Sequence, residues 1–466
     1  MEFAKGLFVL GFAAAIFSGP LEDLKPGEWY EVPNSHMSAL DPCPARGCAW
    51  SGSTGQMSVI DAWSGGAFDT KRDRLIIWGG GHTNYGGNEV YVFDLPTLKW
   101  LRLTDPAPDV SGTVGMSEYP PYNGLIEPRS RHTYNYIQYV PSIDRFCSFG
   151  YSAPYLDGGP GGNQMHAFNF DLNKWERKVS SRGYGLNAMS AYDPVTGHGW
   201  VKGTDSHSWL CEFLPESTTY GKWVNRTTDS ADFYYKYATT MDIDPVARKL
   251  VAVGGGEVWY WDISTPAKGV TQTLVTTAGA TGAVSANDPG MAYDPVTGKI
   301  LAWSSGQTIY SLDVPTKTWT QVSGSGANPG SPSVQGTYGR FRYSPAHNVF
   351  MVVNSVSQNV FFYKHTAGNS FVEAQEIHKS AVLFQATPNP FSRSTQFNVH
   401  LDRAAKPVTL RIYDTQGRLV KEVLRNAMVN NDCSVRWSPK ANAAGTFIAC
   451  LSSGGRTFSR KLLFVP

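Results

Sequence analysis

The feature that most constrains the fold is the stretch 67–103, which reads AFDTKRDRLIIWGGGHTNYGGNEVYVFDLPTLKWLRL. It contains four short runs, AFD, RLIIWGG, EVYVFD and KWLRL, in which aromatic and β-branched residues alternate with others. A turn at Thr70–Asp73, a Gly-rich loop and a turn at Leu95–Lys99 separate these runs. Such runs, bounded by Gly, Pro and Asp, are typical of antiparallel strands. The stretch therefore predicts a four-stranded antiparallel sheet.

The same pattern recurs along the chain at intervals of about 50 residues, which is the signature of a repeat architecture. Later repeats begin at Tyr134, Met189, Thr240, Met291 and Phe341. Four-stranded sheets repeated in this way form a β-propeller, here with six blades, or seven if one repeat is disguised. Trp29–Val32 resembles the last strand of a blade but has no strands before it. We predict that it completes the final blade and so removes an exposed sheet edge.

Among the repeats recur a D-P/x-x-x-K/R turn, a Gly-rich end to the second strand, Tyr or Trp followed by x-x-D on the third strand, and Trp on the fourth. In these features the segment Glu28–Lys364 resembles kelch-type propellers. The resemblance implies an all-β fold with a propeller over 28–365. It does not imply an activity, because propellers support many unrelated functions.

Other segments lie on either side of the propeller. Residues 1–19 have one Lys followed by an apolar run from Gly6 to Phe17, too short to span a bilayer but typical of an export signal. No other segment is expected to cross a membrane. The polar stretch 366–385 is predicted to be a linker. From Gln385 onward there are 12 Lys and Arg against 4 Asp and Glu, whereas the rest of the chain has 28 against 34. A mildly acidic body argues against nucleic acid as a partner.

The tail, 386–466, contains a series of ordered motifs. They are Asn389-Pro-Phe391, Ser394-Thr395, Leu410-Arg-Ile-Tyr-Asp414 with Gly417-Arg418, Val435-Arg-Trp437, Ala444-Gly-Thr-Phe447 and Lys461-Leu-Leu-Phe464. In these motifs the tail resembles the immunoglobulin-like C-terminal sorting domain of type IX secretion cargo. The resemblance implies a β-sandwich, the type IX machinery as a partner, and a location outside the cell or anchored at its surface.

The six cysteines are consistent with export. Cys43 with Cys48, and Cys433 with Cys450, are candidate disulfide pairs, but spacing alone does not establish a bond. The sequence has no pair of CxxC motifs, which argues against a structural zinc site.

Strand order constrains where a site can lie. In a four-stranded antiparallel blade, the loops between the second and third strands and the links between blades lie at the same end of the propeller. Here these segments are rich in His, Arg, Tyr and Asn, and the first strand of each blade is the innermost. We therefore expect a polar, aromatic funnel of the kind that holds sugars. The segments are 79–89, 127–134, 157–166, 182–187, 233–237, Asn287-Asp288 and Arg340 with Arg342.

The loop GGGH-x-x-Y-x-G-N-E at 79–89 and the Arg131-His132-Thr-Tyr134 link are similar to features of propeller-fold polysaccharide lyases. The resemblance implies β-elimination on a uronate polysaccharide, which needs a group that neutralises the carboxylate, a base and an acid. The candidates are Arg131 or Arg340 as neutraliser, His132 or His82 as base, and Tyr184 or Tyr234 as acid. Substrate-binding candidates are Asn84, Tyr85, Asn88, Arg129, Asn163, Tyr237 and Arg342.

A lectin-like or adhesive surface protein without turnover is the alternative, because it could use the same funnel. The individual residues also have structural alternatives. The sole role of Gly79–Gly81 could be to allow a tight exit from the strand. Asn88 and Glu89 could hold the loop in place, and Arg129 and Arg131 could pair with acidic residues of adjacent blades. His82, His132 and His166 come from adjacent blades, but no local ligand pair supports a metal, and the sequence specifies no cofactor.

Overall fold

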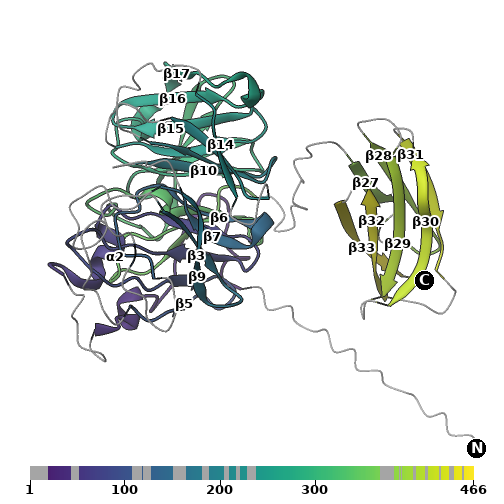
Figure 1. Ribbon diagram of the computed structural model, residues 1–466, viewed down its shortest axis with the longest axis horizontal. Helices are drawn as coiled ribbons and strands as arrows, with labels where there is room; N and C mark the ends of the chain where they lie inside the picture. The colour runs from purple at the N-terminus through teal and green to yellow at the C-terminus, as the bar shows by residue number, and fades with distance from the viewer. Residues whose placement is uncertain are drawn as a thin grey trace, which may run out of the picture. The chain divides into compact units, whose positions relative to one another are not determined.

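The computed structural model describes residues 19–43, 52–107, 118, 127–150, 164–180, 188–203, 209–216, 221–227, 238–367, 382–387, 389, 391–401, 406–414, 418–429, 432–439, 445–453 and 456–465. The chain divides into two compact units, Met1–Ala374 and Gln375–Pro466, each considered by itself (Figure 1). The expected export signal lies outside the described residues except for Gly19.

The first unit consists mainly of short antiparallel strands. Its described strands are β1 (Glu28–Glu31), β2 (Gly66–Asp69), β3 (Arg74–Ile77), β4 (Tyr91–Asp94), β5 (Lys99–Arg102), β6 (Ile137–Val140), β7 (Arg145–Ser148), β8 (Gln164–Asn169), β9 (Lys174–Ser180), β10 (Met189–Asp193), β11 (His198–Lys202), β12 (Leu210–Leu214), β13 (Lys222–Asn225), β14 (Thr240–Asp244), β15 (Lys249–Gly254), β16 (Glu257–Asp262), β17 (Gln272–Leu274), β18 (Ala278–Gly279), β19 (Gly290–Asp294), β20 (Lys299–Trp303), β21 (Thr308–Asp313), β22 (Thr318–Ser323), β23 (Ser325–Gly326), β24 (Phe341–Ser344), β25 (Val349–Val352) and β26 (Phe361–Tyr363). Its short helices among the described residues are η1 (Met37–Leu40), η2 (Gly55–Met57), α2 (Ser58–Asp61), η3 (Pro141–Ile143), η4 (Pro266–Lys268), η5 (Thr281–Ala283) and η6 (Tyr338–Arg340).

These strands form sheets in which chain order equals spatial order, namely β2 to β5, β6 to β9, β10 to β13, β14 to β17, β19 to β22 and β24 to β26. Figure 1 shows β14, β15, β16 and β17 following one another outward. The first strands of successive sheets contact one another in the order β2, β6, β10, β14, β19 and β24, and β24 contacts β2 again. A closed ring of sheets joined at their first strands is a β-propeller, as the repeats predict.

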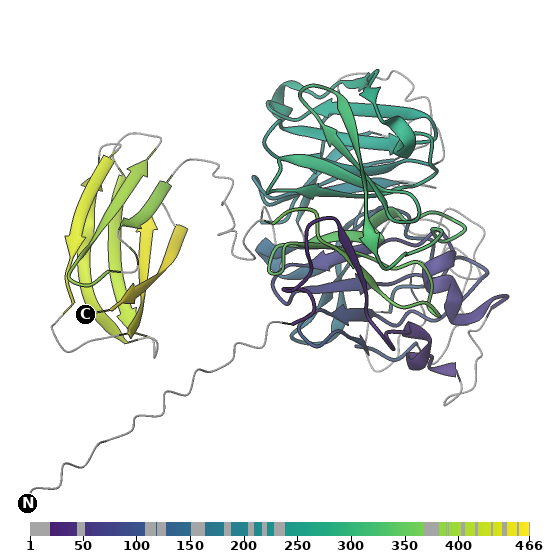
Figure 2. The ribbon, with the colours of Figure 1, turned by 180° about the vertical axis from the view of Figure 1, so that it is seen from behind.

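Strand β1 completes the last sheet. It pairs antiparallel with β26, with Trp29 opposite Tyr363, and the dark purple segment lies beside green strands in Figure 2. The Trp29 ring is buried, and its centroid lies 5.0 Å from that of the Tyr363 ring. Its Nε1 donates a hydrogen bond of 3.0 Å to the carbonyl of Gln307. The prediction that Trp29–Val32 closes the final blade is confirmed.

The acidic residue at the end of a first strand explains the turn that follows it. The carboxylate of Asp193 accepts the amide of Val195 and also receives two hydrogen bonds of 2.7 Å from Arg248 of the next sheet. Asp294 likewise accepts the amide of Val296. One short side chain thus shapes the turn, and in the sheet of β10 it also links that sheet to its neighbour.

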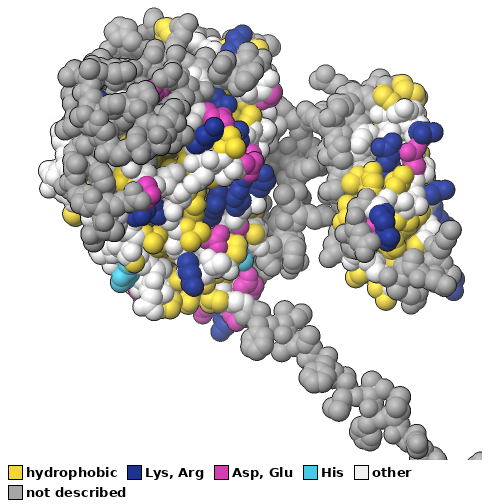
Figure 3. All heavy atoms as spheres, turned by 60° about the horizontal axis from the view of Figure 1, so that its bottom comes forward, with side chains coloured by type: hydrophobic (Ala, Val, Ile, Leu, Met, Phe, Trp, Pro, Cys, Tyr) yellow, Lys and Arg dark blue, Asp and Glu magenta, His cyan; other side chains and the backbone are white. Residues whose placement is uncertain are grey.

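Apolar side chains pack between neighbouring sheets. Trp78 of the first sheet lies 5.0 Å from the Trp175 ring of the second, within a cluster that also contains Ile76 and Phe146. On the face shown in Figure 3, Lys and Arg side chains of the described residues lie among Asp and Glu side chains, with hydrophobic side chains between them. Among the described residues there is no helix long and apolar enough to span a bilayer.

The second unit has two antiparallel sheets around one core that includes Phe397, Leu410, Trp437 and Leu451. The sheet orders are β27-β28-β31 and β30-β29-β32-β33. The strands are β27 (Val382–Thr387), β28 (Thr395–Leu401), β29 (Lys406–Asp414), β30 (Leu419–Val429), β31 (Asp432–Trp437), β32 (Gly445–Ser453) and β33 (Arg456–Phe464).

The structure lacks one of the two candidate disulfide bonds. Cys433 and Cys450 are free thiols on strands of different sheets, so the structure does not contain the disulfide considered between them. Cys43 is disulfide-bonded, and its candidate partner Cys48 lies outside the described residues.

Candidate functional site

The links that enter the first strands share an unusual backbone feature. Two or three residues before the first strand, five of the sheets have a non-glycine residue with positive φ: Trp63 (47°), Tyr134 (41°), Ala238 (105°), Asp288 (46°) and Tyr338 (50°). L-residues rarely adopt this region, and those that do cluster at functional sites where the surroundings hold them in place. The repetition of the feature in successive links indicates a common cause.

That cause is hydrogen bonding from link to link. The amide of Tyr134 donates to the carbonyl of Trp63 (2.6 Å), the amide of Asp288 to that of Ala238 (2.9 Å), and the amide of Tyr338 to that of Asp288 (3.2 Å). Three of the five residues thus donate their N–H to the preceding link, and these hydrogen bonds help to hold their left-handed conformation. The links thereby gather at one end of the ring, which we call the link end.

Two predicted residues meet at the link end. The ring centroids of His82, from the loop between β3 and β4, and His132 are 4.9 Å apart, and the Trp63 ring lies 4.8 Å from His132. His132 Nδ1 lies 3.2 Å from the hydroxyl of Tyr134, whose ring is 6.0 Å from that of Tyr338. The loop between β3 and β4 and the links that enter β2, β6 and β24 therefore meet in one aromatic cluster.

The cluster contains groups with strongly shifted pKa values. His132 is only 4% exposed, and burial, with a smaller contribution from His82, lowers its pKa to about 3. Asp288 is 7% exposed, and burial raises its pKa to about 7, an effect that the neighbouring Tyr338 hydroxyl only partly offsets. Burial also raises the pKa of Tyr338 well above its usual value. At neutral pH the histidine is therefore uncharged, and the carboxyl group of Asp288 is poised between its two protonation states.

A cavity of about 580 Å³ opens beside this cluster. Trp63 and Asp288 belong to both, and the rest of the lining is mainly small or polar. Polar lining residues include Asn287, Ser304, Ser333 and Gln335. The half-buried Trp63 indole supplies an apolar face next to a carboxyl group and several hydroxyl and amide groups. This combination is suited to a polar ligand that has one apolar face.

The candidate neutraliser Arg340 is held by the backbone. It is fully buried, and its guanidinium donates hydrogen bonds to the carbonyls of Ile60, Ser64, Gly336 and Val353. These carbonyls come from the segment before β2, from the link that contains Arg340 itself, and from the residue that follows β25. Arg340 therefore ties these three parts of the backbone together near the link end. We therefore assign it a structural role.

Arg131 and Arg129 are also buried. Arg131 Nε donates to the carbonyl of Arg129 (3.0 Å), and its guanidinium lies 5.9 Å from the Trp78 ring centroid. Arg129 Nε donates to the carbonyl of Glu118 (3.0 Å). Both side chains thus donate hydrogen bonds to backbone carbonyls, and Arg131 directly precedes His132 in the sequence.

Hydrogen bonds of buried side chains hold the loop that carries His82. The Tyr85 hydroxyl donates to Glu89 (2.6 Å), and Asn88 Nδ2 donates to Glu127 (2.9 Å). Tyr85 and Asn88 are buried, so they hold the loop and do not face the cavity, whereas Asn84 is half-buried on the loop itself. This matches the structural alternative considered for Asn88 and Glu89.

The remaining candidates lie elsewhere. Arg342 lines a second cavity at the opposite end of the ring. The side chain of His166 is 2.7 Å from Glu118, and the described residues contain no group of three or more His, Cys, Asp and Glu placed to hold a metal ion. Asn163, Tyr184, Tyr234 and Tyr237 lie outside the described residues.

Sequence reasoning does not single out Trp63 or Tyr338, and it names Asp288 only as part of a link. A signal for them exists in the sequence. Each occupies the position two or three residues before a first strand, where the repeats place the innermost part of the link. Alignment of the links on the following strand would have brought these three residues together with Tyr134.

No family model and no curated protein matches this chain. Among solved structures it is similar to PorZ, described as a surface component of the type IX secretion system of Porphyromonas gingivalis, at 10% identity over 86% of this chain and 51% of PorZ, with a TM-score of 0.36. An auxiliary nutrient binding protein from Bacteroides thetaiotaomicron is 9% identical over 66% of this chain and 69% of that one (TM-score 0.42). The β-propeller domain of Cps50 (Swd1) from Myceliophteria thermophila is 8% identical over 64% and 96% (TM-score 0.37). The chain thus spans about half the length of PorZ, and its propeller assignment rests on the ring of strands described above.

Proposed function

We propose that this chain is a secreted, six-bladed kelch-like propeller protein that binds an extracellular polysaccharide in the link-end cavity. The observation that supports this is the cavity itself, in which the Trp63 indole lies with Asp288 among hydroxyl and amide groups. An indole can stack on the apolar face of a sugar ring, while carboxyl and amide groups bind its hydroxyls. Binding of this kind does not require the arginine contacts with the ligand that the sequence predicts.

The test is binding of the full-length protein to a panel of polysaccharides, measured by calorimetry. For the best ligand we expect Trp63→Ala to weaken binding by about 1 to 3 kcal/mol, the usual value of one stacking contact. Trp259→Ala serves as the matched control, because Trp259 is half-buried on β16 and does not line the cavity. Equal binding by wild type and Trp63→Ala would overturn the proposal.

Cleavage of a uronate polysaccharide by β-elimination is a second candidate function. It is favoured by the cluster of proton-carrying groups, from Asp288 and Tyr338 to Tyr134 and His132, next to the cavity. In this mechanism a base removes the proton next to the uronate carboxylate, a C=C bond forms, and the glycosidic oxygen leaves with a proton from an acid.

The roles follow from exposure and charge. His82 is the better base, because it is half-buried whereas the pKa of His132 is lowered to about 3. The protonated form of Asp288 can donate a hydrogen bond to the uronate carboxylate in place of the buried arginines. Tyr184 or Tyr234 remains the proposed acid.

Incubation with uronate polysaccharides tests this mechanism, because elimination creates an unsaturated uronate with its own ultraviolet absorbance. Wild type should generate the absorbance, and His82→Ala should lose it while retaining binding. Binding without any new absorbance would instead favour the lectin-like alternative.

We also propose that the second unit is an immunoglobulin-like sorting domain read by the type IX machinery. Its support is the set of tail motifs together with the two sheets around one core. Deletion of 386–466 in a host with that machinery should leave the propeller inside the outer membrane. Unchanged export of the truncated chain would contradict this assignment.

A further inference from the structure

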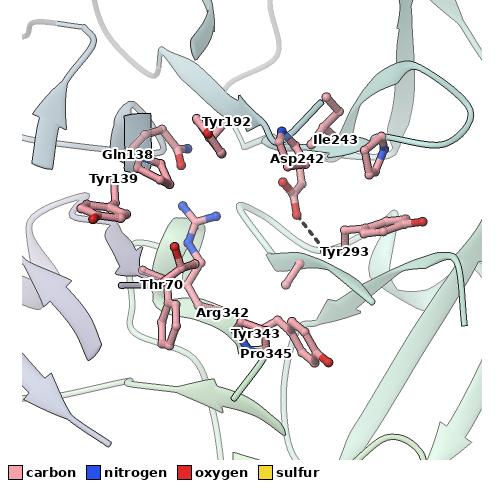
Figure 4. Close-up of a pocket in the computed structure, with 15 residues that line it drawn as sticks. Thr70, Gln138, Tyr139, Tyr192, Asp242, Ile243, Tyr293, Arg342, Tyr343 and Pro345 are labelled. Carbon is pink, nitrogen blue, oxygen red and sulfur yellow. Dashed lines mark hydrogen bonds between the residues drawn. The ribbon is translucent and has the colours of Figure 1, made fainter. Parts of the chain in front are cut away.

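The end of the ring opposite the link end has a cavity of its own, of about 410 Å³ (Figure 4). Its wall is formed by the ends of the first strands, just before the turns into the second strands. The residue two positions before the end of each first strand is alternately small and polar around the ring. These first strands are β2, β6, β10, β14, β19 and β24. In chain order this residue is Ala67, Gln138, Ala191, Asp242, Ala292 and Arg342. Three alanines thus separate three larger polar side chains around the ring, and Ala292 lines the cavity together with Gln138, Asp242 and Arg342.

Arg342 extends into this cavity, as Figure 4 shows. It is only 8% exposed, and its Nε and Nη2 donate to the carbonyls of Gly339 and Gly66, both at 2.9 Å. Its Nη1 donates to none of the described residues. One edge of the guanidinium is therefore anchored by backbone while the other remains available to a ligand.

Asp242 faces the same cavity from the other side. It is 9% exposed, and its Oδ2 accepts the amide of Tyr293 at 2.8 Å, the dashed line in Figure 4. Asp242 and Arg342, both fully described, do not form an ion pair with each other. Burial raises the pKa of Asp242 to about 6 although Arg342 lowers it, and burial lowers the pKa of Arg342. Two opposite charges are thus removed from water without direct pairing, which is unfavourable unless a further group compensates them.

The rim of the cavity is mainly aromatic and only partly exposed. Pro141 and Pro194 are exposed beside it. The residues that follow the alternating position line the rim: Phe68, Tyr139 and Ile243 are buried, and Tyr192, Tyr293 and Tyr343 are half-buried. Inside, Gln138 Nε2 is fixed by donation to Ser190, which orients the amide group. The site therefore combines one cation, one anion and no net charge at its base with apolar rings at its mouth.

We propose that this cavity binds a small zwitterion, an α-amino acid, with the carboxylate on Arg342, the ammonium on Asp242 and an apolar side chain among the aromatic rings of the rim. A ligand with two opposite charges on one carbon compensates both buried groups at once, which a sugar or a simple carboxylate does not. The inference is independent of the proposed polysaccharide function, because the two cavities lie at opposite ends of the ring.

The experiment is calorimetric titration of the full-length protein with phenylalanine and leucine. Matched fragments are 3-phenylpropanoate, which lacks the ammonium, and phenethylamine, which lacks the carboxylate; glucose represents a neutral sugar. We expect the amino acids to bind at least about tenfold more tightly than either fragment, since each fragment leaves one buried charge uncompensated. Failure of both amino acids to bind, equal affinity for a fragment, or preference for glucose would overturn the proposal.

Three variants locate the site. Asp242→Asn keeps an oxygen for the Tyr293 amide and is expected to weaken amino-acid binding about tenfold or more. Asp262→Asn, an exposed aspartate of the same blade, should not change it. Ala292→Leu fills the cavity without altering a charge and should abolish binding, whereas Trp63→Ala at the link end should leave it intact. Unchanged binding in both Asp242→Asn and Ala292→Leu would overturn the assignment even if an amino acid binds elsewhere.

Discussion

Replacing Asp288 by asparagine is expected to stabilise the propeller, and to do so only at pH values above the pKa of the carboxyl group in the unfolded chain. Burial raises the pKa of this group from 3.8 to about 7 in the folded chain. A group whose pKa is raised on folding contributes stability that is complete below its unfolded pKa and is lost as the pH rises through the folded pKa. The difference between these two values corresponds to about 4 kcal/mol above pH 7. Asparagine has similar shape and no charge, so it avoids this cost.

The assay is denaturant unfolding of wild type and Asp288→Asn across the pH range from 3.8 to above 7. The two proteins should have similar free energies of unfolding at the acid end, and the variant should become progressively more stable until the gain levels off above about pH 7. Asp262→Asn is the control, because Lys249 and Ser264 lower the pKa of exposed Asp262, so its loss should bring no gain at alkaline pH. A gain that is absent, or equal at every pH, would refute the view that Asp288 is held as a buried carboxyl group.

Three further outcomes test the architecture. Trp29→Ala should lower the free energy of unfolding in denaturant by about 3 to 5 kcal/mol, because β1 loses its buried ring. Trp29→Phe should lower it by only about 1 kcal/mol, for the lost hydrogen bond to Gln307, and equal losses in the two variants would contradict this. Arg248→Met should lower the free energy of unfolding by about 3 to 5 kcal/mol at neutral pH, because it leaves the buried carboxylate of Asp193 without its cation. The pKa of Asp193 is lowered in the folded chain, so the loss should shrink in acid as this carboxyl group is protonated; a pH-independent loss would contradict the pairing. Arg340→Met should lower the free energy of unfolding by a similar amount yet leave polysaccharide affinity of the folded protein unchanged; loss of affinity at unchanged stability would restore it as a ligand-binding residue.

The propeller is predictable from sequence because its determinants are local and repeated. Alternating strand residues, turns with aspartate and a lone closing strand at Trp29–Val32 each follow from chemistry within a few residues. The meeting of His82 with His132 also follows, since strand order alone sends both segments to the same end of the ring. In contrast, the roles of Arg131 and Arg340 depend on which backbone carbonyls approach them. A guanidinium that faces a ligand and one that is saturated by carbonyls look the same in a sequence.

The separation of Arg342 from the link end shows why strand bounds matter more than proximity in sequence. Arg340 lies beneath the links, and Arg342 is only two residues further along. Arg340 ends the short helix η6, whereas Arg342 is the second residue of β24, a strand of only four residues. Because the inner strands are so short, two residues are enough to move a side chain from the backbone of the links to the cavity at the opposite end of the ring. Counting back two residues from the last residue of each first strand would assign Gln138, Asp242 and Arg342 to the end opposite the link end. Counting back from the start of each first strand into its link would assign Trp63, Tyr134, Asp288 and Tyr338 to the link end.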